Sequence, residues 1–340
     1  MGSHRRLAPS GFDRGASAAG IAVCVMSAAA AALGALPAAA APQDDTRAEV
    51  DRLYTQAEKA TEAYNKADER AGSLHEQVST AQDEIARQQE RINTMRDALG
   101  SLAGAQYRSG GLDPSLALLF SDDPADYLDK SAVLDRITAH QAGELKDLQL
   151  AMLELARKRE EATGKLAELE RSREAVAQHK QTVERKLAKA RELLNSLPYA
   201  ARAAYDRASR SARSDMSDLE GAVPSSARAA AALAAARSAV GRPYVWGANG
   251  PGGFDCSGLM QWSYAQAGLG LPRTSQAQQY AGRQVPLSQA QPGDLVTYRS
   301  DASHVGMYVG NGQVIHAPYP GAPVRYDPVD MMPISSVTRV

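Results

Sequence analysis

The 340-residue sequence has little of several residue types, and each scarcity narrows what the protein can be. Its 38 basic and 39 acidic residues nearly cancel, so no overall charge attracts nucleic acid or an anionic membrane. Aromatic residues make up only 5% of the chain, which is low for one compact globule and fits a chain that is largely coiled coil. Only two cysteines are present, which excludes a framework of several disulfides.

A long uncharged apolar run lies near the N terminus, at residues 21–36. A basic start precedes it, and small residues at 38–41 follow it, so residues 1–41 are predicted to be a secretory signal peptide. The run is short for a membrane span, which needs about 20 residues. An uncleaved anchor, a lipoprotein anchored through Cys24 and a twin-arginine signal are the alternatives.

Glycine and proline are scarce between residues 44 and 219. From residue 50 to residue 102, apolar residues recur in alternating steps of three and four, and Gln88 is the one break. This heptad pattern predicts a coiled-coil helix on the order of 80 Å long.

A second apolar seam is predicted over residues 134–197, and it is interrupted by three cations, Arg159, Arg173 and Lys180. These cations suggest that the second helix packs loosely against the first, or that another molecule docks there. Turn residues separate the two seams, so residues 44–198 are expected to form an antiparallel helical hairpin. The apolar stretch 116–120 at its tip is interpreted as a cap of the coil end, with a partner-docking knob as the alternative.

Residues 199–225 mix alanine with polar residues and end in a glycine- and proline-containing turn, which is typical of a linker. After them glycine and proline become frequent and both tryptophans appear. The sequence therefore predicts a second compact domain over residues 226–340.

Cys256 is the only cysteine that remains once the predicted signal is removed. A lone cysteine in an oxidising compartment cannot form an internal disulfide. A run of turn residues precedes it and a mostly apolar segment follows, so it is expected at the first turn of a core helix. Exposed N–H groups and the helix dipole favour the thiolate there, and the N–H of Cys256 could stabilise an oxyanion.

Two histidines follow in segments that are predicted to be neighbouring strands. His304 opens one strand, and His316 lies near the far end of the next, after a tight glycine-containing turn. Cysteine, histidine and a second polar residue in this order suggest a cysteine nucleophile, a base and an orienting group. The alternatives are a buried apolar thiol and a zinc site, but the spacing of the three residues makes a weak zinc signature.

Six segments of this domain, taken in order, resemble the NlpC family of papain-like cell-wall cysteine endopeptidases. The resemblance covers residues 227–340, about a third of the chain. The segments are GRPYVWG at 241–247, GFDCSGL at 253–259, LPRTS at 271–275, QPGDLV at 291–296, SHVGMY at 303–308 and VIHA at 314–317.

The resemblance implies an α+β papain-like fold, in which a helix packs on a small antiparallel sheet. It also implies a secreted, metal-independent hydrolase without a cofactor, which cleaves peptidoglycan stem peptides between D-isoglutamate and the diamino acid. Cys256 would be the nucleophile, His304 the general base and His316 the orienting residue. The residues that would line the substrate or oxyanion site are Tyr244, Asp255, Ser257, Arg273 and Ser275.

The helical hairpin resembles, more loosely, those of some secreted wall hydrolases, where it restrains the enzyme or docks it to a membrane-bound division complex. The first reading of the sequence is thus a cell-wall endopeptidase that its own hairpin regulates. A wall-binding coiled-coil adaptor with a vestigial hydrolase domain is the second reading. An amidase or acyl transferase on the same fold is the third, because a thiolate and an oxyanion hole serve any acyl transfer.

Overall fold

The computed structural model describes residues 42–108, 124–210 and 223–340. The predicted signal peptide and the apolar stretch 116–120 lie outside these residues. No helix within the described ranges is long and apolar enough to cross a membrane.

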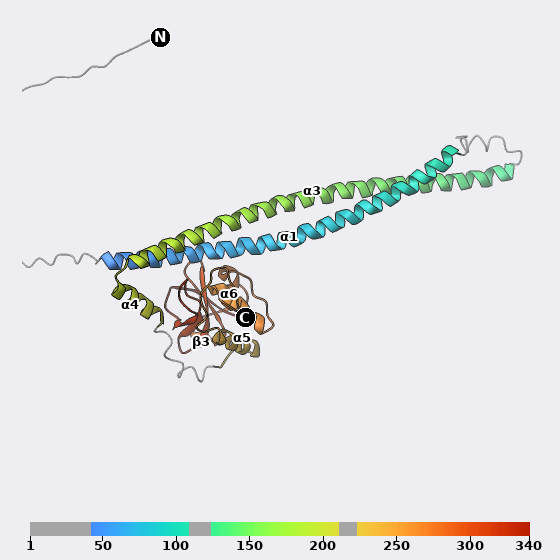
Figure 1. The fold of residues 1–340 in the computed structure, drawn as a ribbon. Helices are drawn as coiled ribbons and strands as arrows, with labels where there is room; N and C mark the ends of the chain where they lie inside the picture. The colour runs from blue at the N-terminus through green and yellow to red at the C-terminus, as the bar shows by residue number, and fades with distance from the viewer. Residues whose placement is uncertain (1–41, 109–123, 211–222) are drawn as a thin grey trace, which may run out of the picture. The chain divides into compact units, whose positions relative to one another are not determined.

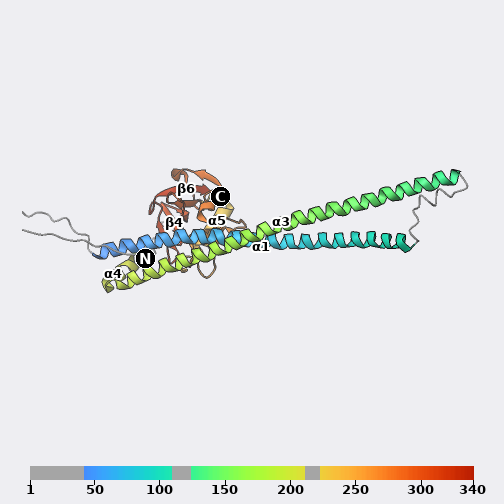
Figure 2. The ribbon, with the colours of Figure 1, turned by 90° about the horizontal axis from the view of Figure 1, so that it is seen from above.

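Two long helices form the predicted coiled-coil hairpin (Figures 1 and 2). Helix α1 spans Pro42–Arg108 and helix α3 spans Pro124–Ser196, and they pack side by side in opposite directions. The first seam is confirmed, since its apolar residues are buried against α3 at Val50, Leu53, Ala57, Leu74, Val78 and Ile92.

The second seam is confirmed in part, since its predicted positions are buried at Leu155, Ala162, Leu169, Val183, Leu187, Ala190 and Leu197. Arg159, Arg173 and Lys180 are exposed, so they do not interrupt the buried stripe of α3. Ala151 is buried where Met152 was expected, and Met152 is 44% exposed. Most of the buried positions keep the seven-residue spacing, whereas Met152 and Leu166, which belong to the other predicted row of the seam, lie outside the interface.

Helix α4, Tyr199–Arg210, occupies the first part of the stretch that was expected to be a linker. Residues 211–222, in the rest of that stretch, are outside the described ranges. Helix α5, Ala227–Ser238, begins at the predicted cap, where the side chain of Ser226 accepts a hydrogen bond from the N–H of Ala229.

The C-terminal domain is built on one six-stranded antiparallel sheet with the order β1-β6-β2-β3-β4-β5. The strands are β1 (Arg283–Val285), β2 (Leu295–Tyr298), β3 (His304–Gly310), β4 (Gln313–His316), β5 (Arg325–Pro328) and β6 (Ile334–Arg339). The short helix α7 (Ser275–Gln278) and the 3-10 helix η3 (Leu287–Gln289) lie in the connections.

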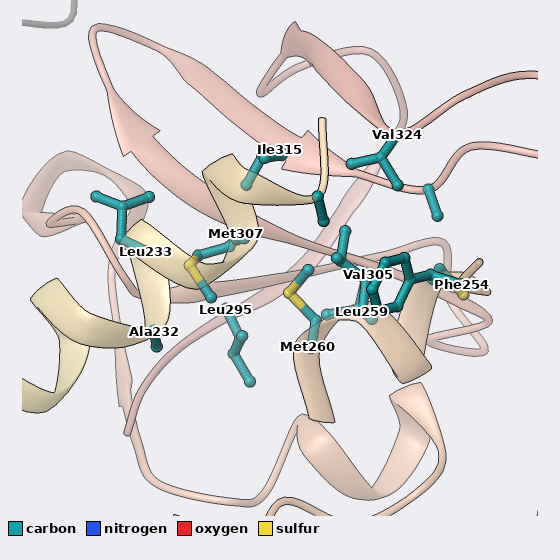
Figure 3. Close-up of a cluster of buried hydrophobic side chains, with 14 of the residues drawn as sticks. Ala232, Leu233, Phe254, Leu259, Met260, Leu295, Val305, Met307, Ile315 and Val324 are labelled. Carbon is teal, nitrogen blue, oxygen red and sulfur yellow. The ribbon is translucent and has the colours of Figure 1, made fainter. Parts of the chain in front are cut away.

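Helices α5 and α6 (Cys256–Gln266) pack on this sheet and enclose the main core with strands β2, β3 and β4 (Figure 3). Leu233, Leu259, Met260, Leu295 and Met307 are among the buried side chains of that core. The helices of the domain thus bury their apolar faces on a small antiparallel sheet, and the predicted α+β papain-like fold is confirmed.

The turn between β3 and β4 sets the positions of the two histidines. Gly310 pairs with Gln313, so Asn311 and Gly312 form a two-residue loop, and both have positive φ. Such a loop suits the right-handed twist of the strands. The register that follows pairs Met307 with Ile315, which brings the start of β3 close to the end of β4.

Candidate active site

Cys256 lies at the first turn of α6, where the sequence predicts it. Asp255 is the N-cap, and its Oδ1 accepts a hydrogen bond of 2.7 Å from the N–H of Gly258. A Cβ at position 258 would lie 2.2 Å from the carbonyl oxygen of Ala248, so this tight turn requires glycine. Cys256 is only 1% exposed, and its thiol therefore faces a site that is closed to solvent.

The two predicted histidines are hydrogen-bonded to each other. Nε2 of His304 lies 2.7 Å from Nδ1 of His316. Gly306 makes this approach possible, because its missing Cβ would come within 3.2 Å of the Cβ of His316. The Sγ atom of Cys256 and a ring nitrogen of His304 lie within 4.8 Å of each other. The fold thus brings the three predicted catalytic residues together.

Asp327 completes this chain of contacts, and the sequence analysis missed it. Its Oδ2 lies 2.8 Å from Nε2 of His316 and also accepts a bond of 2.8 Å from Nε of Arg325. Asp327 and His316 are diagonal neighbours on β5 and β4, since Val314 pairs with Asp327. A lone aspartate on a strand gives no signal until the strand order and register are known.

The protonation of the chain follows from its hydrogen bonds. Burial, ahead of the opposing effect of the hydrogen bond that His316 donates to Asp327, lowers the pKa of His316 to about 4, so this ring is neutral at pH 7. Asp327 can only accept, so His316 carries its proton on Nε2 and accepts from His304 through Nδ1. Nδ1 of His304 is then the nitrogen that remains for the thiol proton.

A polar stripe of α1, formed by Glu58, Thr61, Glu62 and Asn65, covers this site. All four side chains are 2–3% exposed. The carboxylate of Glu58 bridges two groups, Nδ1 of His304 and Nη1 of Arg299, the latter at 2.6 Å. Glu58 thus binds the ring nitrogen through which His304 would act as a base.

Glu62, one turn further along α1, lies over the thiol. It accepts hydrogen bonds from Oγ of Ser257 at 2.7 Å, the N–H of Ser275 at 2.9 Å and Sγ of Cys256 at 3.5 Å. Asn65 follows and donates to Oδ2 of Asp255 at 3.1 Å.

Aromatic contacts flank the polar stripe at both ends. Tyr54 stacks on Tyr319 with ring centroids 5.0 Å apart, and Tyr64 meets Trp246 edge-on at 5.2 Å. The stripe was not identified from the sequence, because polar residues spaced by three and four along a coiled coil are typical of a solvated face.

The electrostatics of this covered site disfavour the thiolate. Burial and then the carboxyl groups of Glu62, Glu58 and Asp255 raise the pKa of Cys256 well above its ordinary value. The expectation that the helix start favours the thiolate is therefore wrong for this state of the protein. The helix N terminus is present, but burial and three neighbouring carboxyl groups outweigh it.

The two glutamates shift in opposite directions. Burial alone would raise the pKa of Glu58, but the nearby His304 and Arg299 lower it, so Glu58 is ionised. Burial and then the charge of Asp255 raise the pKa of Glu62 to about 8, despite the hydrogen bonds that it accepts and the nearby Arg273. The ionised Glu58 is hydrogen-bonded to Nδ1 of His304, so this nitrogen is not available for the thiol proton while α1 covers the site.

The residues expected to line the substrate or oxyanion site all lie around Cys256. Arg273 pairs with both oxygens of Asp255, at 3.0 and 2.6 Å, and donates to Oγ of Ser257 at 3.1 Å. Ser275 offers its N–H to Glu62, while its Oγ donates to the carbonyl of Ala302 at 2.7 Å.

Tyr244 is buried beside the thiol, and its hydroxyl has no hydrogen-bond partner in the described structure. Burial and then Cys256 raise its pKa well above the ordinary value, so the hydroxyl keeps its proton. A buried donor without a partner is costly. This one is suited to a substrate carbonyl oxygen that would come next to Cys256.

Glu58, Cys256 and His304 also carry ligand atoms within 4.8 Å of one another, a set of donors that could hold zinc. Both oxygens of Glu58 already bind His304 and Arg299. We therefore interpret this group as a hydrogen-bonded latch and assign it no metal.

Glu62 makes the covering of the site dependent on pH. Its pKa is about 8 when α1 covers the site, against 4.5 for a free carboxyl, so the covered state holds a proton that the open state releases. The contribution of Glu62 to covering is complete below pH 4.5 and is lost as the pH rises through 8. Glu58, whose pKa is lowered, loses its contribution only as the pH falls through the acid range.

We therefore expect covering to weaken between pH 6 and pH 8, by up to about tenfold per pH unit. Glu62→Gln, a neutral side chain of the same shape, should remove most of this dependence. The measurement is the alkylation rate of Cys256 in the unchanged chain divided by that in Glu62→Gln, because the titration of the thiol then largely cancels. A ratio that stays constant from pH 6 to pH 8 would contradict the prediction.

A thiol at a helix N terminus, backed by two hydrogen-bonded histidines on adjacent strands, is the arrangement of a cysteine peptidase. This class is consistent with the α+β fold that surrounds it. The comparison with known families makes the assignment specific: residues 241–338 match the NlpC/P60 family, so the chain carries an NlpC/P60 domain.

Two relatives, each named as a probable endopeptidase, match about a third of this chain. A probable endopeptidase of Mycobacterium tuberculosis is 52% identical over 100 residues, which are 29% of this chain and 26% of that protein. A probable endopeptidase of Corynebacterium glutamicum is 48% identical over 118 residues, which are 35% of this chain and 56% of that protein. The chain thus spans about a quarter to just over half of the length of these relatives.

Among solved structures, the NlpC/p60 domain of the peptidoglycan hydrolase SagA is 37% identical. The match covers 33% of this chain and 98% of that domain, with a TM-score of 0.32.

Proposed function

We propose that this protein is an exported peptidoglycan hydrolase that cleaves stem peptides between D-isoglutamate and the diamino acid. The relatives named as endopeptidases and the domain of a peptidoglycan hydrolase support the substrate class. The observation that carries the proposal is the Cys256–His304–His316 arrangement, with the thiol within 4.8 Å of His304 and the two histidines 2.7 Å apart.

In the proposed reaction Glu58 first leaves His304. Nδ1 of His304 then takes the proton of Cys256, and the thiolate attacks the scissile carbonyl carbon. The N–H of Cys256 and the hydroxyl of Tyr244 donate to the oxyanion. His304 returns the proton to the leaving amine, which gives a thioester on Cys256. A water molecule, deprotonated by His304, hydrolyses the thioester and releases the γ-carboxyl of the glutamate.

Helix α1 restrains this reaction in our proposal. Glu58 holds the nitrogen of the base, and Glu62 occupies the place of the substrate carbonyl over the thiol. Activity then requires that α1 move away from the catalytic domain. Recruitment by a membrane-bound division complex and export through residues 1–41 are parts of this proposal that stay predictions.

The proposal is tested by mass spectrometry of purified muropeptides after incubation with the chain from residue 42 onward. The chain carries Glu58→Lys to displace α1, and alkylation of Cys256 shows independently that the site is open. The control carries Cys256→Ala in addition. We expect fragments split after D-isoglutamate with the first chain and none with the control.

The other outcomes are equally informative. No fragments from the unmodified chain, when alkylation of a separate sample shows that its site is open, would contradict a hydrolase and favour a wall-binding adaptor. Fragments split at another amide bond would keep the cysteine mechanism and change the substrate to that of an amidase. Fragments that persist in Cys256→Ala would contradict the assigned nucleophile.

A further inference from the structure

Arg299 lies in the loop between β2 and β3 and has no function in the reaction described above. Its backbone is in the left-handed region, with φ 67°. Its N–H donates to the carbonyl of Pro333 at 2.7 Å, and its carbonyl accepts from Ala302 at 3.1 Å. Its guanidinium donates to Oγ of Ser303 at 3.1 Å. Non-glycine residues in this conformation are strained and concentrate at functional sites.

The backbone contacts of Arg299 lie within the catalytic domain, so the position of its backbone does not depend on α1. Its charge, however, is paired by α1. Among the described residues, the carboxylate that pairs with Arg299 is that of Glu58, at 2.6 Å. When α1 moves away, the guanidinium of Arg299 is left beside His304 without its anion. A cation that has lost its anion in this way attracts a carboxylate.

The chemistry of His304 tells which part of a substrate would meet Arg299. His304 must hand a proton to the leaving amine, so the ligand atoms next to its Nδ1 belong to the leaving half. One oxygen of Glu58 contacts that nitrogen and the other contacts Arg299. Arg299 therefore lies on the leaving-group side, whereas Glu62, held by Ser257 and Ser275, lies on the acyl side.

There is also room on this side. A cavity of about 420 Å³ extends from Arg299 and His316 toward Tyr319 and Met331. Helix α1 forms one wall of this cavity, through residues that include Tyr54 and Glu58. This space can hold the continuation of a leaving residue beyond its amine.

We propose that Arg299 selects substrates whose leaving residue carries a free carboxylate, and that Glu58 imitates this carboxylate while α1 covers the site. The proposal rests on the proposed function and specifies its leaving group. Two sources supply the same chemistry: the main-chain carboxylate of a leaving residue at the end of a stem peptide, or the side-chain carboxylate of a diamino acid such as diaminopimelate.

The test compares Arg299 with Arg299→Gln in a chain from residue 42 that carries Glu58→Ala and Glu62→Ala. This background removes the contacts of α1 with Cys256, His304 and Arg299, so any remaining effect of Arg299 concerns the substrate. Three muramyl tripeptides serve as probes. One ends in diaminopimelate with all carboxylates free, one has its main-chain carboxylate amidated, and one has lysine in place of diaminopimelate.

We expect Arg299→Gln to lower kcat/KM for the free diaminopimelate substrate by about tenfold to a hundredfold, mainly through KM. The amidated and lysine substrates identify the source, because the one that lacks the bound carboxylate should be cleaved equally by both chains. Arg299→Lys should recover part of the loss. Lys59→Gln, which removes the other ion pair between α1 and this loop (Lys59–Asp301, 2.7 Å), should not change the preference.

A merely structural Arg299 would give a different result. If it served only as a clasp for α1, Arg299→Gln would change cleavage of all three substrates in the same proportion, and the inference would be wrong. Cleavage with an unchanged preference contradicts the inference and leaves the proposed function intact. No cleavage of any probe by the unmodified chain, when a separate sample of that chain reacts rapidly with iodoacetamide at Cys256, contradicts the proposed function, and this inference with it.

Discussion

Replacement of Glu58 by lysine is expected to raise the alkylation rate of Cys256, and the rate of peptidoglycan cleavage, by about a hundredfold. Glu58 is 3% exposed, and its carboxylate joins Arg299 and His304 across the interface with α1. Removing one member of a buried ion pair costs about 3–5 kcal/mol. Lysine places a second cation beside Arg299, so the covered state loses stability relative to the open state.

The measurement is the rate of reaction of Cys256 with iodoacetamide, followed by mass spectrometry, beside muropeptide cleavage. Glu84→Lys is the matched control. It makes the same change on the same helix, but Glu84 pairs with Lys158 of α3, at 2.7 Å, and not with the catalytic domain. Equal activation by both variants would mean that the helical hairpin acts through its general stability. No activation by Glu58→Lys would contradict the latch.

In the chain released by Glu58→Lys, His304→Gln is expected to reduce cleavage by about 10³- to 10⁴-fold. Nδ1 of His304 is the nitrogen left for the thiol proton, because Nε2 is bonded to His316. General acid–base catalysis contributes about 10²- to 10⁴-fold, and here the same group also activates the nucleophile. Glutamine can keep a hydrogen bond to His316 but cannot take the proton.

The measurement is kcat on the same muropeptides, with His75→Gln as the control on the exposed surface of α1. That control should retain the activity of its parent chain. Activity of His304→Gln within tenfold of its parent would show that another group takes the thiol proton. The order of protons that we infer along His304, His316 and Asp327 would then be wrong.

Much of this protein could be predicted from local patterns. The first heptad seam was correct because the apolar spacing of an α-helix does not depend on what lies far away in the chain. The start of α6 was correct because turn residues, an aspartate cap and an apolar stretch are all adjacent in sequence. The neighbouring histidines were found because the two-residue turn at Asn311 and Gly312 determines the pairing of β3 and β4.

The errors have physical causes that no local pattern reveals. The second seam was correct only in part, because the packing of α3 against α1 decides which of the predicted positions are buried, and it leaves Met152 and Leu166 exposed. The prediction of a thiolate was wrong for the covered site because the pKa of Cys256 responds to burial and to Glu62, which is 194 residues away in sequence. Asp327 was missed because it reaches His316 only through the pairing of β4 with β5.

The sequence by itself determined a coiled-coil helical hairpin, a domain of papain-like fold and a cysteine with two histidines, since spacing and motif order carry that information. The tertiary structure decided the state of the site. Glu58, Glu62 and Asn65 have the spacing of a solvated helix face, and only the packing of α1 on the catalytic domain buries them over Cys256. Whether a carboxyl group is an exposed charge or a latch depends on its desolvation and its partners, which are properties of the folded chain.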